Sequence, residues 1–228
     1  MEVEYIQPTG KWHRLVPSHF PTIDVFEDCY ESAEDQEIAF EIESLTNDRL
    51  RHEAGELNLV PMEDRVFGAG ATAVMAAFTH TGKPSRFTTG EWFGIYYAAQ
   101  DVETAVLETM HHTAKFLSST NEGDTELTMR CYTTKVEKPL IDIANGDHVK
   151  LHDPDNYLEA QKFAISARNE NEWGIHYKSA RNEDKNNIAI LRPPAISKCT
   201  QAAHYRYRWS GHKQAFTGYF KVSELHLV

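Results

Sequence analysis

The sequence predicts an α+β fold in a single domain that covers residues 1–228. Apolar residues with helical spacing crowd the first half of the chain, whereas short alternating runs typical of strands crowd the second half. No internal repeat, low-complexity tract or long Gly/Ser linker divides the sequence, and its length suits one ordinary core. We expect a mostly antiparallel or split sheet flanked by helices, with a helical N-terminal extension over about residues 1–65 and a sheet-rich core over about 66–228.

Several segments carry helix signals. Ser32 and Asp35 have the spacing of a capping box, and Asp101 has the position of an N-cap before the clearest amphipathic pattern in the chain. Asp153 and Pro154 predict the N-cap and first position of a later helix. The expected helices cover about 32–51, 71–78, 102–117 and 153–168.

Strands are expected where β-prone or alternating residues follow turn formers. Leu127, Met129 and Cys131 alternate with polar residues, a pattern typical of a half-buried strand. The HYRYRW run places aromatic side chains on one side of a strand and Arg206 and Arg208 on the other, where they could contact nucleic acid. In an acidic protein we favour an aromatic core face backed by solvated or ion-paired arginines. The expected strands cover about 95–99, 127–131, 139–143, 174–180, 188–192, 204–209 and the last residues to 228.

Composition and charge limit the classes of function. The formal net charge of −11 repels phosphate polymers, so nucleic acid is not an expected partner, and a dinucleotide would need a local basic pocket. The sequence contains no stretch of about 18 apolar residues, the length that could cross a bilayer. The first residues lack a secretory signal, so we expect a cytoplasmic protein with no membrane partner. Cys29, Cys131 and Cys199 are few, distant and odd in number, which fits a reducing compartment.

Common catalytic and binding motifs find little support. Residues 68–73 fit the letters of the dinucleotide fingerprint G-x-G-x-x-A, but the segment before them contains Pro61 and several polar residues and does not resemble a buried first strand. The cysteines never pair as C-x-x-C, and the twelve histidines are scattered, so no metal site is expected. The sequence contains neither a nucleophile elbow nor a Walker A loop.

A set of segments is more specific in combination. In chain order these are Ser85-Arg86-Phe87, a G-x-Y-Y-A-A run over 94–99, an E-T-A-x-x-E-T run over 103–109 and a G-I-x-Y-x-S-x-R run over 174–181. Together they resemble the RES-domain proteins, bacterial toxins named for an Arg, Glu and Ser trio. Further segments, from Trp12 to the HYRYRW strand, extend the resemblance over nearly the whole chain.

The resemblance implies a catalytic trio of Arg86, Glu108 and Ser179 and an NAD⁺-binding set of Arg86, Phe87, Tyr97 and Ser179. It also implies a fold like that of ADP-ribosyltransferases, in which a split sheet clasps NAD⁺. NAD⁺ would be a substrate, with no true cofactor and no metal. Two departures concern the loop over 182–187, where the family often has a glycine-rich G-G-E-C stretch, and Ala160, where a serine is frequent.

The residue types suit cleavage of the nicotinamide glycosidic bond. A carboxylate such as Glu108 would oppose the positive charge of an oxocarbenium-like ribose, and the planar fork of Arg86 could bind a pyrophosphate. Without the resemblance, an exposed helix glutamate and a solvated arginine would be the favoured interpretations. Of Tyr96 and Tyr97, which face opposite ways on a strand, one is expected in the core. Ser179 is too weak to act unaided, so we expect it to hydrogen-bond to substrate or to Glu108.

The expected function is therefore that of a toxin that cleaves NAD⁺ as a glycohydrolase or phosphorylase. The alternatives are a mono-ADP-ribosyltransferase with a protein target and a non-catalytic nucleotide-binding module, and a nucleic-acid binder using Arg206 and Arg208 is the weakest option. The resemblance further implies a helix-turn-helix antitoxin of the Xre type as partner, and it leaves open whether the toxin forms a homodimer within that complex.

Overall fold

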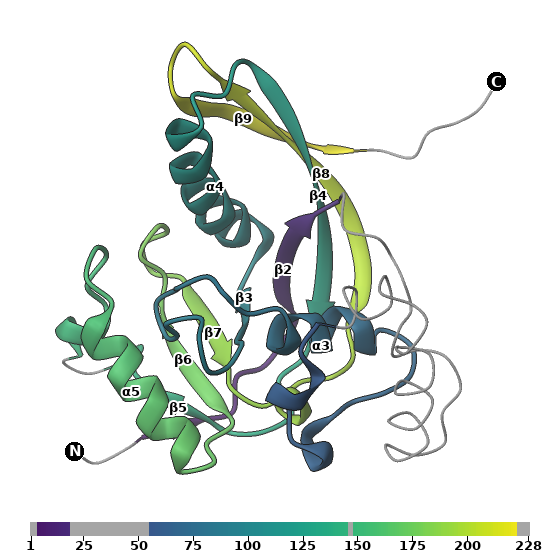
Figure 1. Ribbon diagram of the computed structural model, residues 1–228, viewed down its shortest axis with the longest axis vertical. Coiled ribbons are helices and arrows are strands. Elements are labelled where there is room, and N and C mark those ends of the chain that lie inside the picture. Colours follow the sequence, from purple (N-terminus) through teal and green to yellow (C-terminus); the bar gives the residue numbers. More distant parts are fainter. Residues whose placement is uncertain (1–3, 19–54, 146–147, 223–228) are drawn as a thin grey trace.

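The computed structural model describes residues 4–18, 55–145 and 148–222. The helix expected over 32–51 and the expected strand residues beyond 222 lie outside the described residues. Within these ranges the strands form one nine-stranded sheet in the order β1-β5-β6-β7-β3-β2-β4-β8-β9 (Figure 1). Every neighbouring pair is antiparallel except β5 and β6, so the predicted α+β fold is confirmed.

The strands and helices have the following bounds. The strands are β1 (Tyr5–Ile6), β2 (Trp12–Pro17), β3 (Tyr96–Ala99), β4 (Thr125–Thr134), β5 (Leu140–Asp142), β6 (Gly174–Lys178), β7 (Asn186–Ile190), β8 (Thr200–Ser210) and β9 (Ala215–Val222). The helices are α3 (Ala71–Thr79), α4 (Val102–Ser119) and α5 (Leu158–Asn169), and short 3-10 helices lie at Leu57–Leu59, Met62–Asp64, Val149–Leu151 and Pro193–Ala195.

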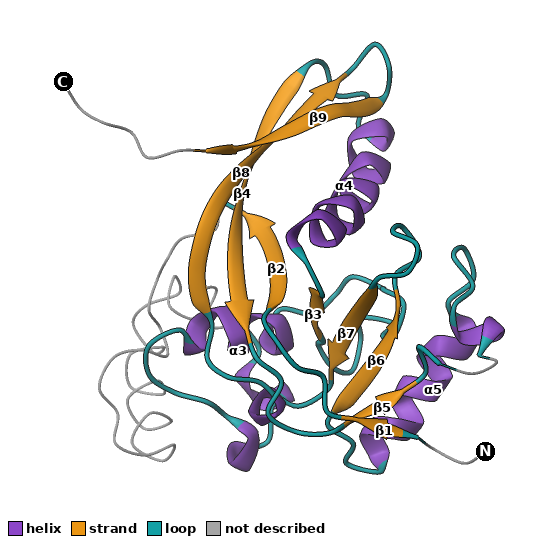
Figure 2. Ribbon diagram, turned by 180° about the vertical axis from the view of Figure 1, so that it is seen from behind, coloured by secondary structure: helices purple, strands orange, loops and turns teal. Residues whose placement is uncertain are grey.

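The sheet divides between β3 and β2. These two strands pair only at Ala99 and His13, whereas β2 pairs with β4 at six positions and β3 with β7 at four. In Figure 2, β2, β4, β8 and β9 curve away as one half, and β3, β7, β6, β5 and β1 form the other. Helix α4 stands beside the first half and above the second, so the expected split sheet flanked by helices is present.

Alternating residues of β3 and β7 face two different hydrophobic cores. Tyr96 and Ile188 belong to the core under α3, while Tyr97 and Ala189 pack with the core under α5. A third core joins the apolar face of α4 to β4 and β8. Because β7 is covered on both faces, its residues 187–190 are all buried, and burial does not alternate along the strand.

The expectation of helix was wrong for residues 4–18, whereas the described residues 55–65 contain two short 3-10 helices. Residues 4–18 contribute strands instead of helix, and β2 lies inside the sheet between β3 and β4. The segment from Trp12 to Pro17 is short and mixes apolar with basic residues, so its strand character comes from pairing on both sides.

The start of the fourth expected helix was also misplaced. Asp101 does cap α4, and its side chain accepts a hydrogen bond from the Thr104 amide at 2.8 Å. The Asp153 Oδ1 instead accepts from the amides of Asp155 and Asn156, at 2.9 and 2.8 Å, and so forms a local turn. Because the Asp153 side chain accepts hydrogen bonds within this turn, it does not cap a helix, and α5 begins later, at Leu158.

Two motifs have structural explanations. Gly70 caps α3 with φ +83°, and a Cβ there would meet the backbone of Cys199, so close packing accounts for this glycine of the fingerprint. On β8, Tyr207 and Trp209 are buried while Arg206 and Arg208 lie near Glu126, at 3.4 and 3.7 Å. This arrangement agrees with the favoured interpretation of an aromatic core face and an ion-paired basic face.

Within the described ranges, no helix has the length and apolar character needed to cross a membrane.

Candidate active site

Glu108 and Ser179 meet where α4 passes the end of β6. Glu108 lies in the second turn of α4, and Ser179 follows the last residue of β6. The Ser179 hydroxyl donates to Glu108 Oε1 at 2.6 Å, a short charge-assisted hydrogen bond. The expected contact between these two residues, 71 positions apart in the chain, is therefore present.

Asn187 supplies a second donor to the same carboxylate oxygen. Its Nδ2 lies 2.9 Å from Glu108 Oε1, and its side chain is 3% exposed at the start of β7. Among the described residues, no hydrogen bond reaches Glu108 Oε2. The carboxylate is thus anchored through one oxygen, which leaves the other available to a ligand.

The Ser179 hydroxyl is held by its own turn. The backbone amides of Arg181 and Asn182 each donate to Ser179 Oγ at 3.2 Å, while the hydroxyl proton is directed at Glu108. A hydroxyl fixed in this way acts as an oriented donor. The group that accepts its proton is a carboxylate and not the imidazole that activates the serine of a Ser–His pair.

Arg86 is buried and anchored by a loop before α5. Its Nη1 donates to the carbonyls of Leu151 and Asp153 at 3.2 and 2.8 Å, and its guanidinium lies 4.9 Å from the ring centre of Tyr157. Within the described part of the chain, its hydrogen bonds all use Nη1. The rest of the planar fork keeps donors for an anionic group.

The residues around Arg86 form a packed wall. Tyr97 Oη lies 2.7 Å from Ser85 Oγ and accepts from the Phe87 amide at 3.2 Å, and burial raises the pKa of Tyr97 to about 12. Tyr96 is fully buried, which confirms that one of the two tyrosines belongs to the core. Phe87 is fully buried against Tyr177, with ring centres 4.9 Å apart.

Gln161 holds the Ser85–Thr88 segment in place. From α5 its Nε2 donates to the carbonyls of Ser85 and Thr88, at 2.9 and 3.2 Å. The preceding residue, Ala160, is fully buried against the sheet. Gln161 therefore fixes the loop that presents Arg86, a role that sequence reasoning did not identify.

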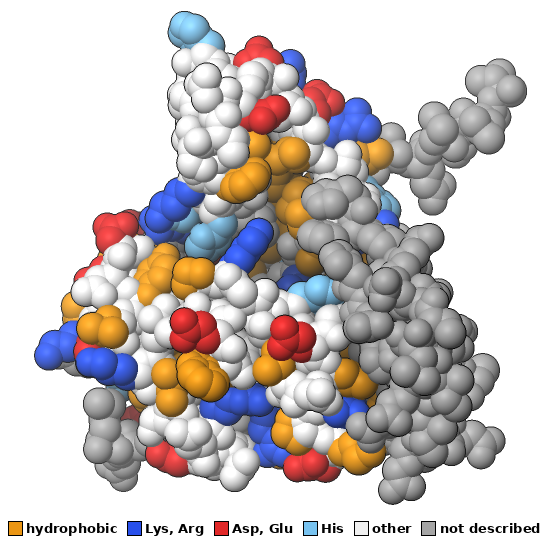
Figure 3. Space-filling model, viewed as in Figure 1, with side chains coloured by type: hydrophobic (Ala, Val, Ile, Leu, Met, Phe, Trp, Pro, Cys, Tyr) orange, Lys and Arg blue, Asp and Glu red, His pale blue; other side chains and the backbone are white. Residues whose placement is uncertain are grey.

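The charges of Glu108 and Arg86 act on the same neighbours. Burial first, and then the Glu108 charge, raise the pKa of Tyr177, while Arg86 opposes the shift. Desolvation lowers the pKa of His112, with Glu108 opposing the shift and Arg86 adding to it. Figure 3 shows the surface hollowed below α4, with histidine and basic side chains at the margin of the hollow. The charges of Glu108 and Arg86 thus act on the same two side chains, and no hydrogen bond or ion pair joins the two described residues.

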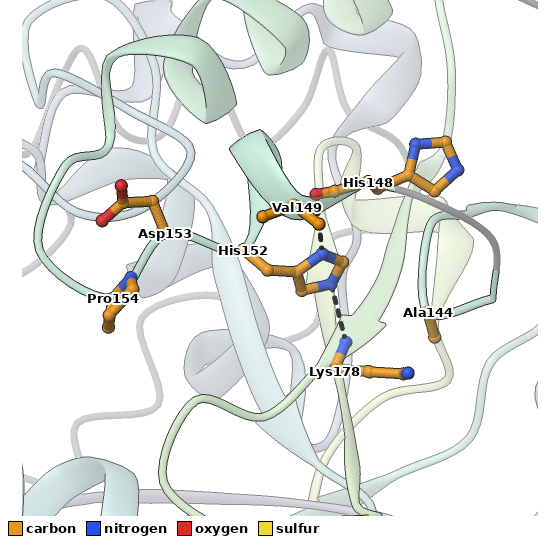
Figure 4. Close-up of a pocket in the computed structure, with 7 residues that line it drawn as sticks. All are labelled: Ala144, His148, Val149, His152, Asp153, Pro154 and Lys178. Atoms are coloured by element: carbon orange, nitrogen blue, oxygen red, sulfur yellow. Dashed lines mark hydrogen bonds between the residues drawn. The ribbon is translucent and has the colours of Figure 1, made fainter.

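A pocket of about 340 Å³ is lined by residues of the loop that anchors Arg86 and by Lys178 at the end of β6 (Figure 4). Its lining includes His148, His152 and Lys178. The His152 Nε2 accepts from the Lys178 amide at 3.2 Å and its Nδ1 lies 3.1 Å from the His148 carbonyl. With both ring nitrogens bonded to backbone, His152 braces the loop rather than offering a ligand donor. Across the described ranges, no group of three or more His, Cys, Asp or Glu side chains could hold a metal ion.

Comparison with known proteins identifies the family. Residues 63–210 match the sequence profile of the family described as RES domain. The chain belongs to the RES-domain family. The matched region includes the whole trio and Asn187, so the resemblance of the short segments is confirmed.

Two similar proteins cover most of this RES-domain chain. The uncharacterized protein y4oC of Sinorhizobium fredii (strain NBRC 101917 / NGR234) is 27% identical over 215 residues, which make up 88% of this chain and 84% of that protein. The crystal structure of the M. tuberculosis MbcT-MbcA toxin-antitoxin complex contains a chain with 12% identity and a TM-score of 0.48, and the match covers 92% of this chain and 89% of that chain.

Two side chains of the loop that departs from the usual RES pattern contact residues of the candidate site. Residues 182–187 provide Asn187, which contacts Glu108, and Asn182, whose Nδ2 donates to Thr104 Oγ1 at 2.8 Å. Sequence reasoning missed both asparagines because an amide in a polar loop has no distinguishing pattern. Only the register of β7 beside β6 brings Asn187 opposite Tyr177 and close to Glu108.

Proposed function

We propose that this RES-domain protein cleaves NAD⁺ at the bond between nicotinamide and ribose, as the toxin of a toxin-antitoxin pair. The observation that carries the enzymatic proposal is the carboxylate of Glu108, fixed through Oε1 beside a region that Arg86 also influences. The toxin role follows from the family resemblance described above.

In the proposed reaction, the C1′–N bond breaks and its electron pair leaves with nicotinamide. The ribose develops oxocarbenium character, which the negative charge of Glu108 Oε2 opposes. Ser179 and Asn187 keep the carboxylate oriented while the charge develops. Arg86 holds the pyrophosphate through donors other than the anchored Nη1.

The acceptor distinguishes three forms of the reaction. Attack by water gives ADP-ribose, attack by inorganic phosphate gives its 1-phosphate, and attack by a protein side chain gives ADP-ribosylated protein. In each case the acceptor oxygen or nitrogen forms the new bond to C1′ and loses a proton to solvent. We propose water or phosphate for this chain, with the protein acceptor as the alternative, and an Xre-type antitoxin as the cognate partner.

The test is release of nicotinamide from NAD⁺ by the purified chain, with and without phosphate, beside the isosteric variant Glu108→Gln. The variant keeps an acceptor oxygen for Ser179 and Asn187 but removes the charge. We expect its kcat to fall by about 100-fold or more, a typical cost of losing one oriented electrostatic group. Circular dichroism and thermal unfolding check that its fold is kept.

Each result separates the alternatives. Faster release with phosphate identifies a phosphorylase, and equal release without it identifies a glycohydrolase. Absence of free nicotinamide release, together with NAD⁺-dependent labelling of added cell proteins, would favour the transferase. NAD⁺ binding without any turnover would contradict the enzymatic proposal and leave a nucleotide-binding module.

A further inference from the structure

One stripe of α4 faces the turn that joins β6 to β7. Asp101, the N-cap of α4, and then Thr104 and Glu108 are spaced by three and four positions, which places them along the same side of the helix. The facing segment runs from residue 179 to residue 187, and we refer to it as the docked turn.

Every residue of this stripe contacts the docked turn. Lys185 Nζ lies 3.1 Å from Asp101 Oδ2, and Asn182 Nδ2 donates to Thr104 Oγ1 at 2.8 Å. At the last residue of the stripe, Ser179 and Asn187 both donate to Glu108 Oε1. The docked turn therefore packs along the first two turns of α4, and Glu108 is the last residue of α4 in this row of contacts.

These contacts differ in how far they are shielded from water. The side chains of Lys185 and Asp101 are 42% and 35% exposed, and ion pairs as exposed as this contribute little. Asn187 is 3% exposed, so its hydrogen bond to Glu108 lies in a medium of lower dielectric. Asn187 is thus the shielded member of the docked turn that touches the candidate catalytic carboxylate.

We infer that Asn187 is a positioning residue for the reaction, which fixes Glu108 so that Oε2 faces the ribose. This inference rests on the proposed function and adds to it a residue outside the Arg, Glu and Ser trio. A carboxylate held by one donor can swing about that bond, whereas two donors on one oxygen fix the direction of the other. A shift of about 1 Å in a reacting group costs on the order of 100-fold in rate.

An amide suits this position because it donates without carrying charge. The isosteric substitution Asn187→Asp would put an acceptor beside Glu108 at neutral pH, and the two carboxylates would repel. As the pH falls, the pair of carboxylates would take up one shared proton. The introduced carboxyl group would then donate a hydrogen bond to Glu108, as the amide of Asn187 does. This substitution therefore gives a pH-dependent signature that a loss of packing would not give.

The experiment compares Asn187→Ala and Asn187→Asp with the matched control Asn186→Ala. The Asn186 side chain makes no hydrogen bond to any described residue, while its backbone amide bonds to Gln100 Oε1 at 3.2 Å. Steady-state nicotinamide release gives kcat and KM for each protein. We expect kcat of Asn187→Ala to fall by about 10- to 100-fold with KM changed less than about threefold, and Asn186→Ala to match the wild type.

For Asn187→Asp, we expect the rate relative to wild type to rise as the pH is lowered from 8 to about 5.5, as two close carboxyl groups take up a shared proton. Equal kcat for Asn187→Ala and wild type would overturn the inference while leaving the proposed function intact. A pH-independent deficit in Asn187→Asp, with a lowered melting temperature in both variants, would also overturn it, because the role would then be structural.

A crystal structure of Asn187→Ala keeps the inference testable if the wild type releases no nicotinamide. That failure would reject the proposed function, and the position of the Glu108 carboxylate would then decide the positioning role. Rotation of the carboxylate away from its wild-type direction supports the inference, and an unchanged direction contradicts it. The structure of Asn186→Ala serves as the reference for crystal-to-crystal variation.

Discussion

At the scale of single residues, the site is organised by the hydrogen bonds of one carboxylate. Ser179 and Asn187 come from the ends of neighbouring strands and both donate to Glu108 Oε1. Arg86 is fixed separately, by carbonyls of the loop before α5. The trio in the family's name therefore consists of one hydrogen-bonded pair and one arginine that is anchored by other residues.

His152 predicts a pH dependence of stability. Desolvation by burial is the main cause that lowers the pKa of His152, and the charges of Arg86, His148 and Lys178 add to it, while its hydrogen bond to the His148 carbonyl opposes it. A lowered folded pKa means that the unfolded chain binds the proton more tightly. This contribution to stability is complete above pH 6.5, the unfolded value, and is lost as the pH falls towards the folded pKa.

We expect the free energy of unfolding to decrease from pH 7 to pH 5, because the unfolded chain binds more protons than the folded chain in this range. His13, His111 and His112, whose pKa values are also lowered, share this decrease. Urea unfolding at several pH values measures this decrease. The free energy of unfolding should decrease less steeply with falling pH in His152→Gln than in the wild type, because Gln keeps a donor and an acceptor but takes up no proton. Parallel curves for the variant and the wild type would contradict this assignment.

At the scale of elements, α4 serves the fold with one face and the site with another. Ala105 and Val106 are buried in the core with β4 and β8, whereas Thr104 and Glu108 meet the docked turn. Amphipathic spacing predicts such a division on any surface helix. The unusual feature here is that the polar side contacts protein, because the split sheet places the end of β6 beneath it.

Two glycines provide an element-scale prediction about the start of α3. Gly70 and Gly10 have similar positive φ values, +83° and +85°, but a Cβ at Gly70 would meet the Cys199 backbone whereas one at Gly10 would meet nothing within 4 Å. Gly10→Ala should therefore cost about 1 kcal/mol, the backbone strain alone. Gly70→Ala should cost about 1–3 kcal/mol more, from forced separation of α3 and the segment before β8.

Chemical denaturation of the two alanine variants measures this difference directly. Equal losses of stability would show that the backbone angle alone explains Gly70. The dinucleotide fingerprint would then need another explanation than close packing.

At the scale of the whole molecule, the net charge is negative, but several basic side chains lie near the candidate site. The chain has a net charge of −11, yet Arg86, Arg181 and Lys115 all act on His112 beside Glu108. A local basic region of this kind is what a dinucleotide needs in an acidic protein. The arginines of β8, by contrast, lie beside Glu126 on the far half of the split sheet.

This distribution predicts no affinity for nucleic acid. Single-stranded DNA or RNA should show no binding in a fluorescence anisotropy titration even at about 10 mM salt, where long-range attraction is weakly screened. Binding that weakens steeply with added salt, and that disappears in Arg206→Glu, would contradict the prediction and revive β8 as an interface.

The sequence by itself determined the family, the strands of the second half and, among the described residues, the helices with clear spacing, and it predicted the trio. Helix α4 and its Asp101 cap were predictable because both depend on neighbours within one turn of the chain. Strand β2, the late start of α5 and the contacts of Gln161 and Asn187 were decided by the tertiary structure alone. The physical reason is that hydrogen bonds between distant segments depend on strand register and chain crossing, and neither leaves a periodic trace in the sequence.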